Sequence, residues 1–418
     1  MALGYLTGAP AFGWVYDLFL IVVAWVTGFL TARKESLVIE RFHEVVLSAR
    51  VPNRITLTFE NRDTQPLRVR IRDEAPPSFI CDRREFQISL KPGGSMDATY
   101  WTTPPERGDD HFRGTYARFH CPLGLVEKQL VYNTETPVRV YPNVLAMNEF
   151  ELLNQRGRLR EIGVRKSRMR GLGTEFESLR DYSIGDDYRK IDWKATGRRG
   201  KIIVRQYEVE RNQTVLLTID IGRHMIGEIN GIPKLDSVLD ACLMLSRAAF
   251  SAGDQVGLLV YADKVVRFIP PAKSRNQIGA IVEALHDLVA LPVESSPVQA
   301  YAYLGGRWKR RSFLVAFTDA GDRDRAKSLG ISLQSMVRRH LVLLARISDP
   351  MLKKALLDPM VSTTDFYRRA SGIMIDEDRR DATTVLSTMG IKNLESEPQD
   401  LASALVSYYF DVKERALI

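Results

Sequence analysis

The chain has 418 residues, of which 45% are hydrophobic and 26% are charged, and its formal net charge is +8. This length suits two or three domains, the composition excludes a disordered chain, and the modest positive charge favours an anionic partner such as a membrane surface, nucleic acid or an acidic protein. The three cysteines form no Cys-x-x-Cys pair, which excludes the common zinc and iron–sulfur spacings and makes a reducing compartment the simpler interpretation.

Residues 1–33 contain a long apolar run. Between Phe12 and Ala32 the only charged residue is Asp17. A helix of about 20 apolar residues crosses a bilayer, and no Lys or Arg precedes Arg33 as a signal peptide would require. The sequence therefore predicts a retained transmembrane anchor. By the positive-inside rule, Arg33 and Lys34 place the rest of the chain in the cytoplasm, at the inner membrane.

Residues 34–145 alternate apolar and polar side chains, which is typical of half-buried strands. Alternation is strict in "ITLTFEN" (Ile55 to Asn61) and "LRVRIRD" (Leu67 to Asp73), and turn residues separate the two segments. Short strands at this spacing favour an all-β sandwich of immunoglobulin-like type. The side chains expected to face inward are Ile55, Leu57, Phe59, Leu67, Val69 and Ile71.

Residues 146–211 lose this alternation and are predicted to connect two domains. The stretch from Arg156 to Gly171 is rich in Arg, but it lacks interleaved aromatic residues that could stack on bases. Nucleic acid is therefore not expected as a partner.

Residues 212–418 alternate strand and helix patterns, beginning with the apolar segment "TVLLTIDIG" (Thr214 to Gly222). Such alternation predicts a doubly wound α/β sheet. Signatures of a nucleotide-binding loop, a nucleophile elbow and a zinc-binding helix are all missing from the sequence. We therefore expect no enzymatic activity.

Two acids remain as candidates for chemistry. Asp220 and Asp319 each lie at the carboxyl end of a predicted strand, where ligands bind in open α/β sheets. Oxygen ligands of this kind suit magnesium, so a metal site is one interpretation. The alternative is that both carboxylates accept hydrogen bonds from loop backbone, and that Asp322 caps the next helix.

This order of elements resembles the von Willebrand factor type A fold. In that family the first strand carries Asp-x-Ser-x-Ser, which forms a metal-ion-dependent adhesion site with a later Thr and Asp. Here Asp220 and Asp319 match, but Gly222 and His224 replace the two serines, and Ser295 or Ser296 is the nearest candidate for the threonine. The resemblance therefore implies a degenerate site and no bound cofactor, with magnesium as the alternative.

The stretch from Gly173 to Asn212 resembles the signature of the bacterial domain of unknown function family 58. The family pattern is Glu-Phe, Leu-Arg-x-Tyr, Gly-Asp, Arg-x-Ile-Asp-Trp and then Arg. The matching residues here are Glu175, Phe176, Leu179, Arg180, Tyr182, Gly185, Asp186, Arg189, Ile191, Asp192, Trp193 and Arg198 or Arg199. Mixed charges of this kind can pin a loop against a folded domain, so we expect this stretch to clamp the β domain onto the α/β domain. A direct role in docking a partner is the alternative.

The predicted fold class is multidomain: an N-terminal transmembrane helix, an all-β immunoglobulin-like sandwich and an α/β doubly wound domain similar to von Willebrand factor type A. The resemblance implies a membrane-anchored, non-enzymatic adaptor or scaffold. Its partners would be a MoxR-type AAA+ ATPase and a client protein that is matured or assembled. The alternative function is a divalent-metal-dependent enzyme, or an adhesion-type binding module, centred on Asp220 and Asp319.

Overall fold

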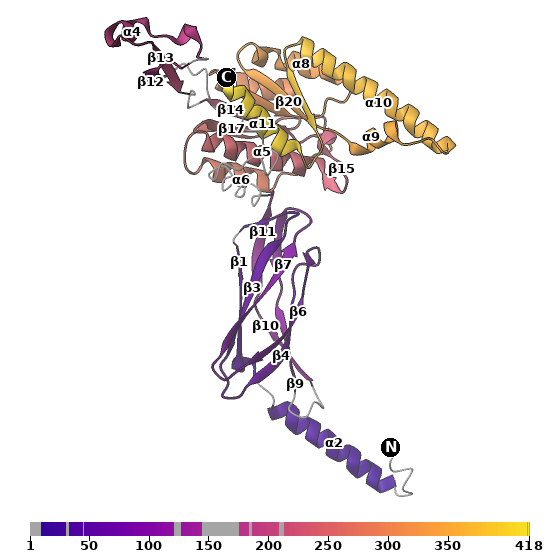
Figure 1. Cartoon of the computed structure of the whole chain (residues 1–418). Coiled ribbons are helices and arrows are strands. Elements are labelled where there is room, and N and C mark those ends of the chain that lie inside the picture. Colours follow the sequence, from indigo (N-terminus) through magenta and orange to yellow (C-terminus); the bar gives the residue numbers. More distant parts are fainter. Residues whose placement is uncertain are drawn as a thin grey trace. The chain divides into compact units, whose positions relative to one another are not determined.

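The structure is a computed structural model that describes residues 10–30, 33–44, 46–120, 127–143, 175–183, 186–208, 213–415 and 417. The chain divides into two compact units, Met1–Asn143 and Val144–Ile418. Figure 1 shows helix and strands in the first unit and alternating strands and helices in the second. The basic segment from Arg156 to Gly171 lies outside the described residues, so its predicted inability to bind nucleic acid stays a prediction.

The first unit begins with helix α2 (Pro10–Leu30), where the sequence predicts a transmembrane anchor. Within the described residues, no helix is both long and apolar enough to cross a bilayer. A crossing takes about 20 predominantly apolar residues, and α2 carries the charged residue Asp17 within its length. The predicted anchor, the membrane part of the fold class and the inner-membrane localisation are therefore wrong.

The rest of the first unit is all-β after a short 3-10 helix, η1 (Lys34–Ser36). Its strands form three sheets, ordered β1-β3-β7-β5, β10-β9-β4-β6 and β2-β11-β8. The strand bounds are β1 (Leu37–His43), β2 (Val46–Ser48), β3 (Asn53–Asn61), β4 (Leu67–Asp73), β5 (Ile80–Cys81), β6 (Glu85–Leu90), β7 (Ser95–Thr103), β8 (Gly108–Phe112), β9 (Thr115–His120), β10 (Glu127–Tyr132) and β11 (Thr136–Tyr141).

Alternation in β3 and β4 places their apolar side chains in one core. The core contains every side chain expected to face inward in these two strands, each at most 6% exposed. An ion pair is buried beside this core: Asp73, at the end of β4, pairs with Arg41 and accepts a hydrogen bond from the Tyr100 hydroxyl at 2.6 Å. Because the carboxylate is paired and hydrogen-bonded, its burial is tolerated.

The second unit contains a six-stranded sheet ordered β18-β17-β14-β19-β20-β21. All neighbouring strands are parallel except β17 and β18, which are antiparallel. The strand bounds are β14 (Thr214–Asp220), β17 (Gln255–Tyr261), β18 (Val265–Ala272), β19 (Phe313–Phe317), β20 (Leu341–Ile347) and β21 (Lys392–Ser396).

Helices cover both faces of this sheet, as its fully buried strands require. On one face α5 (Lys234–Ser251), α6 (Gln277–His286) and α11 (Leu401–Glu414) pack against residues such as Leu217. On the other face α7 (Pro297–Arg307), α8 (Arg323–Val337) and α10 (Thr363–Thr388) pack against residues such as Leu216. Helix α9 (Pro350–Leu357), 3-10 helix η4 (Arg223–Met225) and the short pair β15 (Glu228–Ile229) and β16 (Ile232–Pro233) complete this part.

The remaining described part of the second unit is a hairpin before the sheet. Strands β12 (Glu175–Asp181) and β13 (Ile203–Glu208) pair antiparallel, and between them lie η3 (Tyr188–Lys190) and α4 (Trp193–Arg199). This signature hairpin contains the residues that match the family 58 pattern, except Gly185, which lies outside the described residues.

Candidate functional site

The topology brings the two predicted acids to the same edge of the sheet. Asp220 is the last residue of β14, and Asp319 follows β19 by two residues. The two strands are parallel neighbours, with Ile219 opposite Phe317. The carboxyl ends of adjacent parallel strands form the edge where ligands bind in such sheets, so this edge is the candidate site.

Asp220 is almost fully buried, at 2% exposed, and its carboxylate is surrounded by hydrogen-bond donors. Its Oδ1 accepts the backbone N–H of Gly222 at 2.8 Å and the hydroxyl of Ser295. Its Oδ2 accepts the hydroxyl of Thr318 at 2.7 Å. A buried charge needs such donors in place of water, and both carboxylate oxygens have them here.

Ser295 occupies the space that a side chain at position 222 would need. An ideal Cβ at Gly222 would lie 1.9 Å from Ser295 Oγ and 2.9 Å from the carbonyl oxygen of Val293. Ser295 comes from the loop between α6 and α7, so a distant segment supplies the hydroxyl that Gly222 lacks. Its neighbour Ser296, the other candidate from the sequence, donates its backbone N–H to Ala262 instead, at 2.8 Å.

His224, at the position of the second family serine, belongs to a different set of contacts. The guanidinium of Arg325 donates to its ring Nδ1 at 2.7 Å, and Glu294 lies 3.6 Å from its Nε2. Arg325 is on α8, whose first turn is capped by Asp322 through the Arg325 N–H at 2.9 Å. The expectation that Asp322 caps this helix is therefore confirmed.

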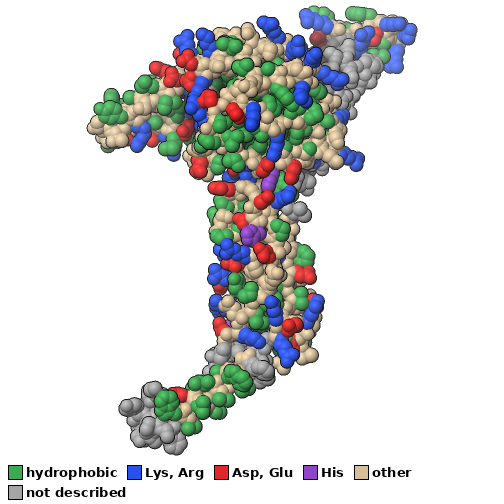
Figure 2. Space-filling model, turned by 180° about the vertical axis from the view of Figure 1, so that it is seen from behind, with side chains coloured by type: hydrophobic (Ala, Val, Ile, Leu, Met, Phe, Trp, Pro, Cys, Tyr) green, Lys and Arg blue, Asp and Glu red, His purple; other side chains and the backbone are tan. Residues whose placement is uncertain are grey.

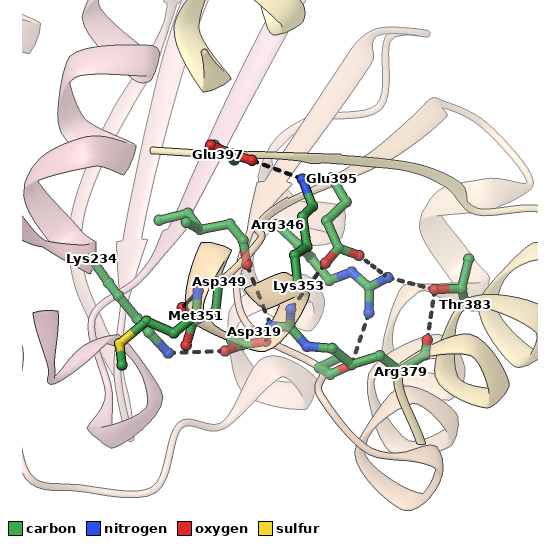
Figure 3. A network of polar contacts seen from close by, with 12 residues as sticks. Lys234, Asp319, Arg346, Asp349, Met351, Lys353, Arg379, Thr383, Glu395 and Glu397 are labelled. Carbon is green, nitrogen blue, oxygen red and sulfur yellow. Dashed lines mark hydrogen bonds and ion pairs between the residues drawn. The ribbon is translucent and has the colours of Figure 1, made fainter. Parts of the chain in front are cut away.

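Asp319 is paired with two cations. Its Oδ2 lies 3.3 Å from the ammonium of Lys234, the first residue of α5, and its Oδ1 lies 3.6 Å from the guanidinium of Arg379 on α10. Figure 3 shows Asp319 between these two side chains. The positive charge that a metal would supply to this carboxylate is therefore supplied by the chain itself.

The Asp319 contacts continue into a polar network across the end of the sheet (Figure 3). Glu395 on β21 accepts from Arg379 at 2.9 Å and from Arg346 at 3.0 Å. Arg346 is 2% exposed and also donates to the carbonyl of Ala320 at 3.2 Å and to the hydroxyl of Thr383. Burial lowers the pKa of Arg346, and the charge of Glu395 opposes that shift. The network thus joins β20, β21 and α10.

This donor set does not fit a divalent cation. A hard cation takes six or more oxygen ligands, but both oxygens of Asp220 are already hydrogen-bonded and Asp319 faces two positive side chains. The described residues contain no group of three or more His, Cys, Asp or Glu side chains placed to hold a metal ion. The arrangement stabilises the loops at this edge rather than preparing them for metal chemistry.

The signature hairpin is held by two ion pairs of its own. Arg180 on β12 donates to both oxygens of Asp186, at 2.7 and 2.6 Å, and Asp186 also accepts the Ser183 N–H at 2.8 Å. Asp192 accepts the Ala195 N–H at 2.9 Å, which caps α4. These bonds therefore hold the segment that connects β12 and β13, near its start through Asp186 and near α4 through Asp192.

Asp192 also receives a charged donor from the opposite strand. The Nε of Arg205 on β13 lies 2.8 Å from its second oxygen. The Ala195 N–H, followed by Arg205, lowers the pKa of Asp192 below its usual range. These contacts explain the mixed charges of the signature as bonds within the hairpin. That the hairpin also clamps the β domain stays a prediction.

Several other signature residues point to solvent. Tyr182, Arg189, Trp193 and Arg198 are exposed, and Arg189 lies over the ring of Tyr188 at 5.8 Å. Leu179 is half-buried on β12, opposite Arg205. Glu175 and Phe176 begin β12, but their side chains lie outside the described part of the chain.

Of the partners of the two acids, the sequence indicated Ser295 but not Thr318, Lys234 or Arg379. Thr318 directly precedes Asp319, a position that the family resemblance does not use, and its hydroxyl bonds Asp220. Lys234 and Arg379 approach Asp319 from helices that begin far apart in the chain. No local pattern identifies these two cations, because only the packing of α5 and α10 brings them together.

The chain is similar to proteins of a known family over the part that contains both sheet-end acids and most of the hairpin. Residues 178–381 match the family described as "Protein of unknown function DUF58", and this range includes most of the signature hairpin, both acids and Arg379. The solved structure of the conserved hypothetical protein BatB from Bacteroides thetaiotaomicron is 12% identical, with a TM-score of 0.32, and covers 48% of this chain and 98% of its own.

Two curated relatives share part of the chain. The uncharacterized protein YeaD of Bacillus subtilis (strain 168) is 25% identical over 126 residues, 30% of this chain and 31% of YeaD. The uncharacterized protein Rv1480 of Mycobacterium tuberculosis (strain ATCC 25618 / H37Rv) is 24% identical over 183 residues, 43% of this chain and 56% of Rv1480. The chain thus spans about a third of the first relative and just over half of the second. From this match, the part of the chain from residue 178 to residue 381 belongs to the DUF58 family.

Proposed function

We propose that this chain is a non-enzymatic adaptor or scaffold that works with a MoxR-type AAA+ ATPase in the maturation or assembly of a client protein. Its α/β domain would be a von Willebrand factor type A-like module with a degenerate metal site. The observation that carries the proposal is that groups of the same domain already occupy the carboxylates of both sheet-end acids. Ser295 and Thr318 saturate Asp220, and Lys234 and Arg379 pair with Asp319.

Catalysis is disfavoured by the same contacts. A general base or nucleophile must reach substrate and exchange protons. Asp220 is buried beneath its hydroxyl donors, and Asp319 is held between two cations. A sheet edge closed in this way supports a binding role for the domain rather than a chemical one.

The strand order supports the type A-like assignment of the module. A central parallel strand ends in Asp220, and the single antiparallel strand, β18, lies at one edge of the sheet. Gly222 replaces the first family serine, and Ser295 fills the space beside it. His224 replaces the second family serine, and Arg325 donates to its ring. The domain therefore keeps the shape of such a module while it lacks the ligand set.

Exposed apolar side chains also favour protein binding. Near the ends of α9 and α10 they include Leu357, at 79% exposed, Val361, at 88%, and Tyr367, at 67%. Figure 2 shows green side chains gathered over this end of the second unit. Contiguous exposed apolar surface of this kind is typical of protein–protein contact sites.

The test is capture of the ATPase by the purified full chain. The chain is immobilised and offered each MoxR-type ATPase encoded in the same genome, with and without ATP. Retention of one of them supports the proposal. Absence of retention, while circular dichroism shows a folded chain, contradicts it. Calorimetry with magnesium, manganese and calcium is run in parallel, and a saturable heat of binding would support the metal-dependent alternative instead.

A further inference from the structure

The signature hairpin exposes large aromatic side chains next to cations. Trp193, the first residue of α4, is 72% exposed and Tyr188 is 69% exposed. Tryptophan rarely remains so exposed on a protein that has no partner, because its burial stabilises a complex strongly. Figure 2 shows Lys and Arg gathered with apolar side chains at the end of the second unit that carries this hairpin.

The cations lie close together in the chain. Lys194, Arg198, Arg199 and Lys201 fall within eight consecutive residues that contain no acid, and all four side chains are exposed. None of the four forms an ion pair with a residue that the structure describes. The acids nearby are already used, since Asp186 pairs with Arg180 and Asp192 with Arg205. The positive charge of this segment therefore faces solvent without local neutralisation.

Helical spacing puts part of this charge beside the tryptophan. Lys194 and Arg198 are one turn apart on α4, and Trp193 and Gly197 form the adjoining row. A Cβ at Gly197 would meet no other atom within 4 Å, so the surface beside Trp193 is open. We call the exposed side chains of Tyr188, Arg189, Trp193, Lys194, Arg198 and Lys201 in this hairpin the α4 patch.

We infer that the α4 patch docks an acidic segment of a partner protein that carries an apolar side chain for Trp193. This inference rests on the proposed adaptor function and names the chemistry of one of its contacts. Carboxylates of the segment pair with Lys194 and Arg198, and its apolar side chain packs on the indole. Aromatic residues and Arg at the centre of such contacts supply most of the binding energy.

The charges around the patch favour a protein segment over nucleic acid. Asp181 and Asp187 are exposed in the same hairpin, outside α4. A nucleic-acid backbone carries regularly spaced negative charge, which these carboxylates repel. A protein segment can place its acids opposite α4 alone, so it matches both signs of charge.

Binding of a synthetic peptide to the full chain tests the inference. The probe is a fluorescein-labelled, glutamate-rich peptide with two central leucines, followed by fluorescence anisotropy at low ionic strength. We expect saturable binding that weakens as salt is added. The variant Lys194→Glu/Arg198→Glu should bind this peptide roughly tenfold or more weakly, and it should gain affinity for a lysine-rich peptide of the same design.

Two further variants make the result specific. The matched control Arg68→Glu/Lys327→Glu reverses two exposed cations on β4 and α8, so it changes the net charge equally. It should keep the affinity of the parent chain, whereas Trp193→Ala should lose affinity without any change of charge. Equal losses in the control and in the α4 variant would overturn the inference, and so would unchanged binding by Trp193→Ala.

Separate measurements exclude other partners. A short DNA duplex that binds the parent chain more tightly than the acidic peptide, at the same salt concentration, would overturn the protein assignment. ATPase capture is scored independently. Loss of capture by the Lys194→Glu/Arg198→Glu variant supports the inference. If the peptide binds the parent chain and all variants as expected but no ATPase is captured, the docking inference stands and the proposed ATPase partner is wrong.

Discussion

The ammonium of Lys413 lies 2.7 Å from a carboxylate oxygen of Asp254, and both side chains are almost completely buried. Lys413 belongs to α11, and Asp254 lies directly before β17. The hydroxyl of Tyr409 donates to the same carboxylate, and burial together with the Asp254 charge raises the pKa of Tyr409 well above its usual value. This contact fastens the last helix to the start of a central strand.

Replacing Lys413 by Met should destabilise the chain markedly, because it leaves the Asp254 charge buried without its cation. Removal of one partner of a buried pair costs about 3–5 kcal/mol. Urea unfolding measures the change. Lys327→Met, at an exposed position on α8, is the control and should change stability by about 0.5 kcal/mol or less. Equal stability of the two variants would contradict the described pairing.

Replacing Gly222 by Ser should destabilise the α/β domain, because the new Cβ collides with Ser295 Oγ and with the Val293 carbonyl. Overpacking of this kind costs about 1–3 kcal/mol. The double variant Gly222→Ser/Ser295→Ala should recover part of the loss, since the closest clash is removed. Thermal unfolding should place the double variant between the parent chain and Gly222→Ser in stability. A double variant no more stable than Gly222→Ser would contradict the described contact.

Replacing Arg379 by Met should loosen α10 at the end of the sheet. Arg379 bonds Glu395 and lies beside Asp319, and both contacts are partly buried. We expect a loss of about 1–2 kcal/mol, less than for a fully buried pair. Hydrogen exchange of the backbone amides of α10 should become faster in this variant. The neighbouring Arg380→Met, at an exposed i,i+4 pair with Asp376, is the matched control and should leave exchange unchanged.

The stability of the chain should depend on pH through His340. Burial, followed by the charge of Arg339, lowers the pKa of His340 below its ordinary value of 6.5. The unfolded chain therefore takes up this proton first, so the His340 contribution is complete above pH 6.5 and is lost as the pH falls toward the folded pKa. Urea unfolding above and below pH 6.5 should show a smaller pH effect in His340→Gln than in the parent.

Local patterns predicted much of the fold. The strict alternation around Ile55 and Val69 predicted strands whose two faces differ, and both residues are buried in β3 and β4. Helices α7 and α9 were missed, although each begins with Pro, after Ser296 and Asp349 respectively. Proline at the first helical position after a capping residue is a helix-start signal, and it identifies both helices.

The candidate site was less predictable than the fold. Asp220 and Asp319 were found because each lies at the carboxyl end of a strand. In a parallel sheet these ends lie along the same edge, so the sequence alone indicates that the two acids are neighbours. Ser295 was one of two candidates for the missing threonine, and its hydroxyl bonds Asp220. Lys234 and Arg379 could not be found, because their contacts depend on helix packing over long separations. The transmembrane prediction relied on the length of the apolar run and on the absence of Lys or Arg before Arg33, and the structure contradicts it.

The central position of β14 has a consequence for synthesis of the chain. This strand is the first of its sheet to leave the ribosome, but one of its two neighbours, β19, starts only at Phe313. Until then one side of a strand that is fully buried in the folded sheet has no hydrogen-bonding partner, and such edges invite association with other chains. A nascent chain that stops before Phe313 should therefore need protection by a chaperone, whereas one that has passed β19 should not.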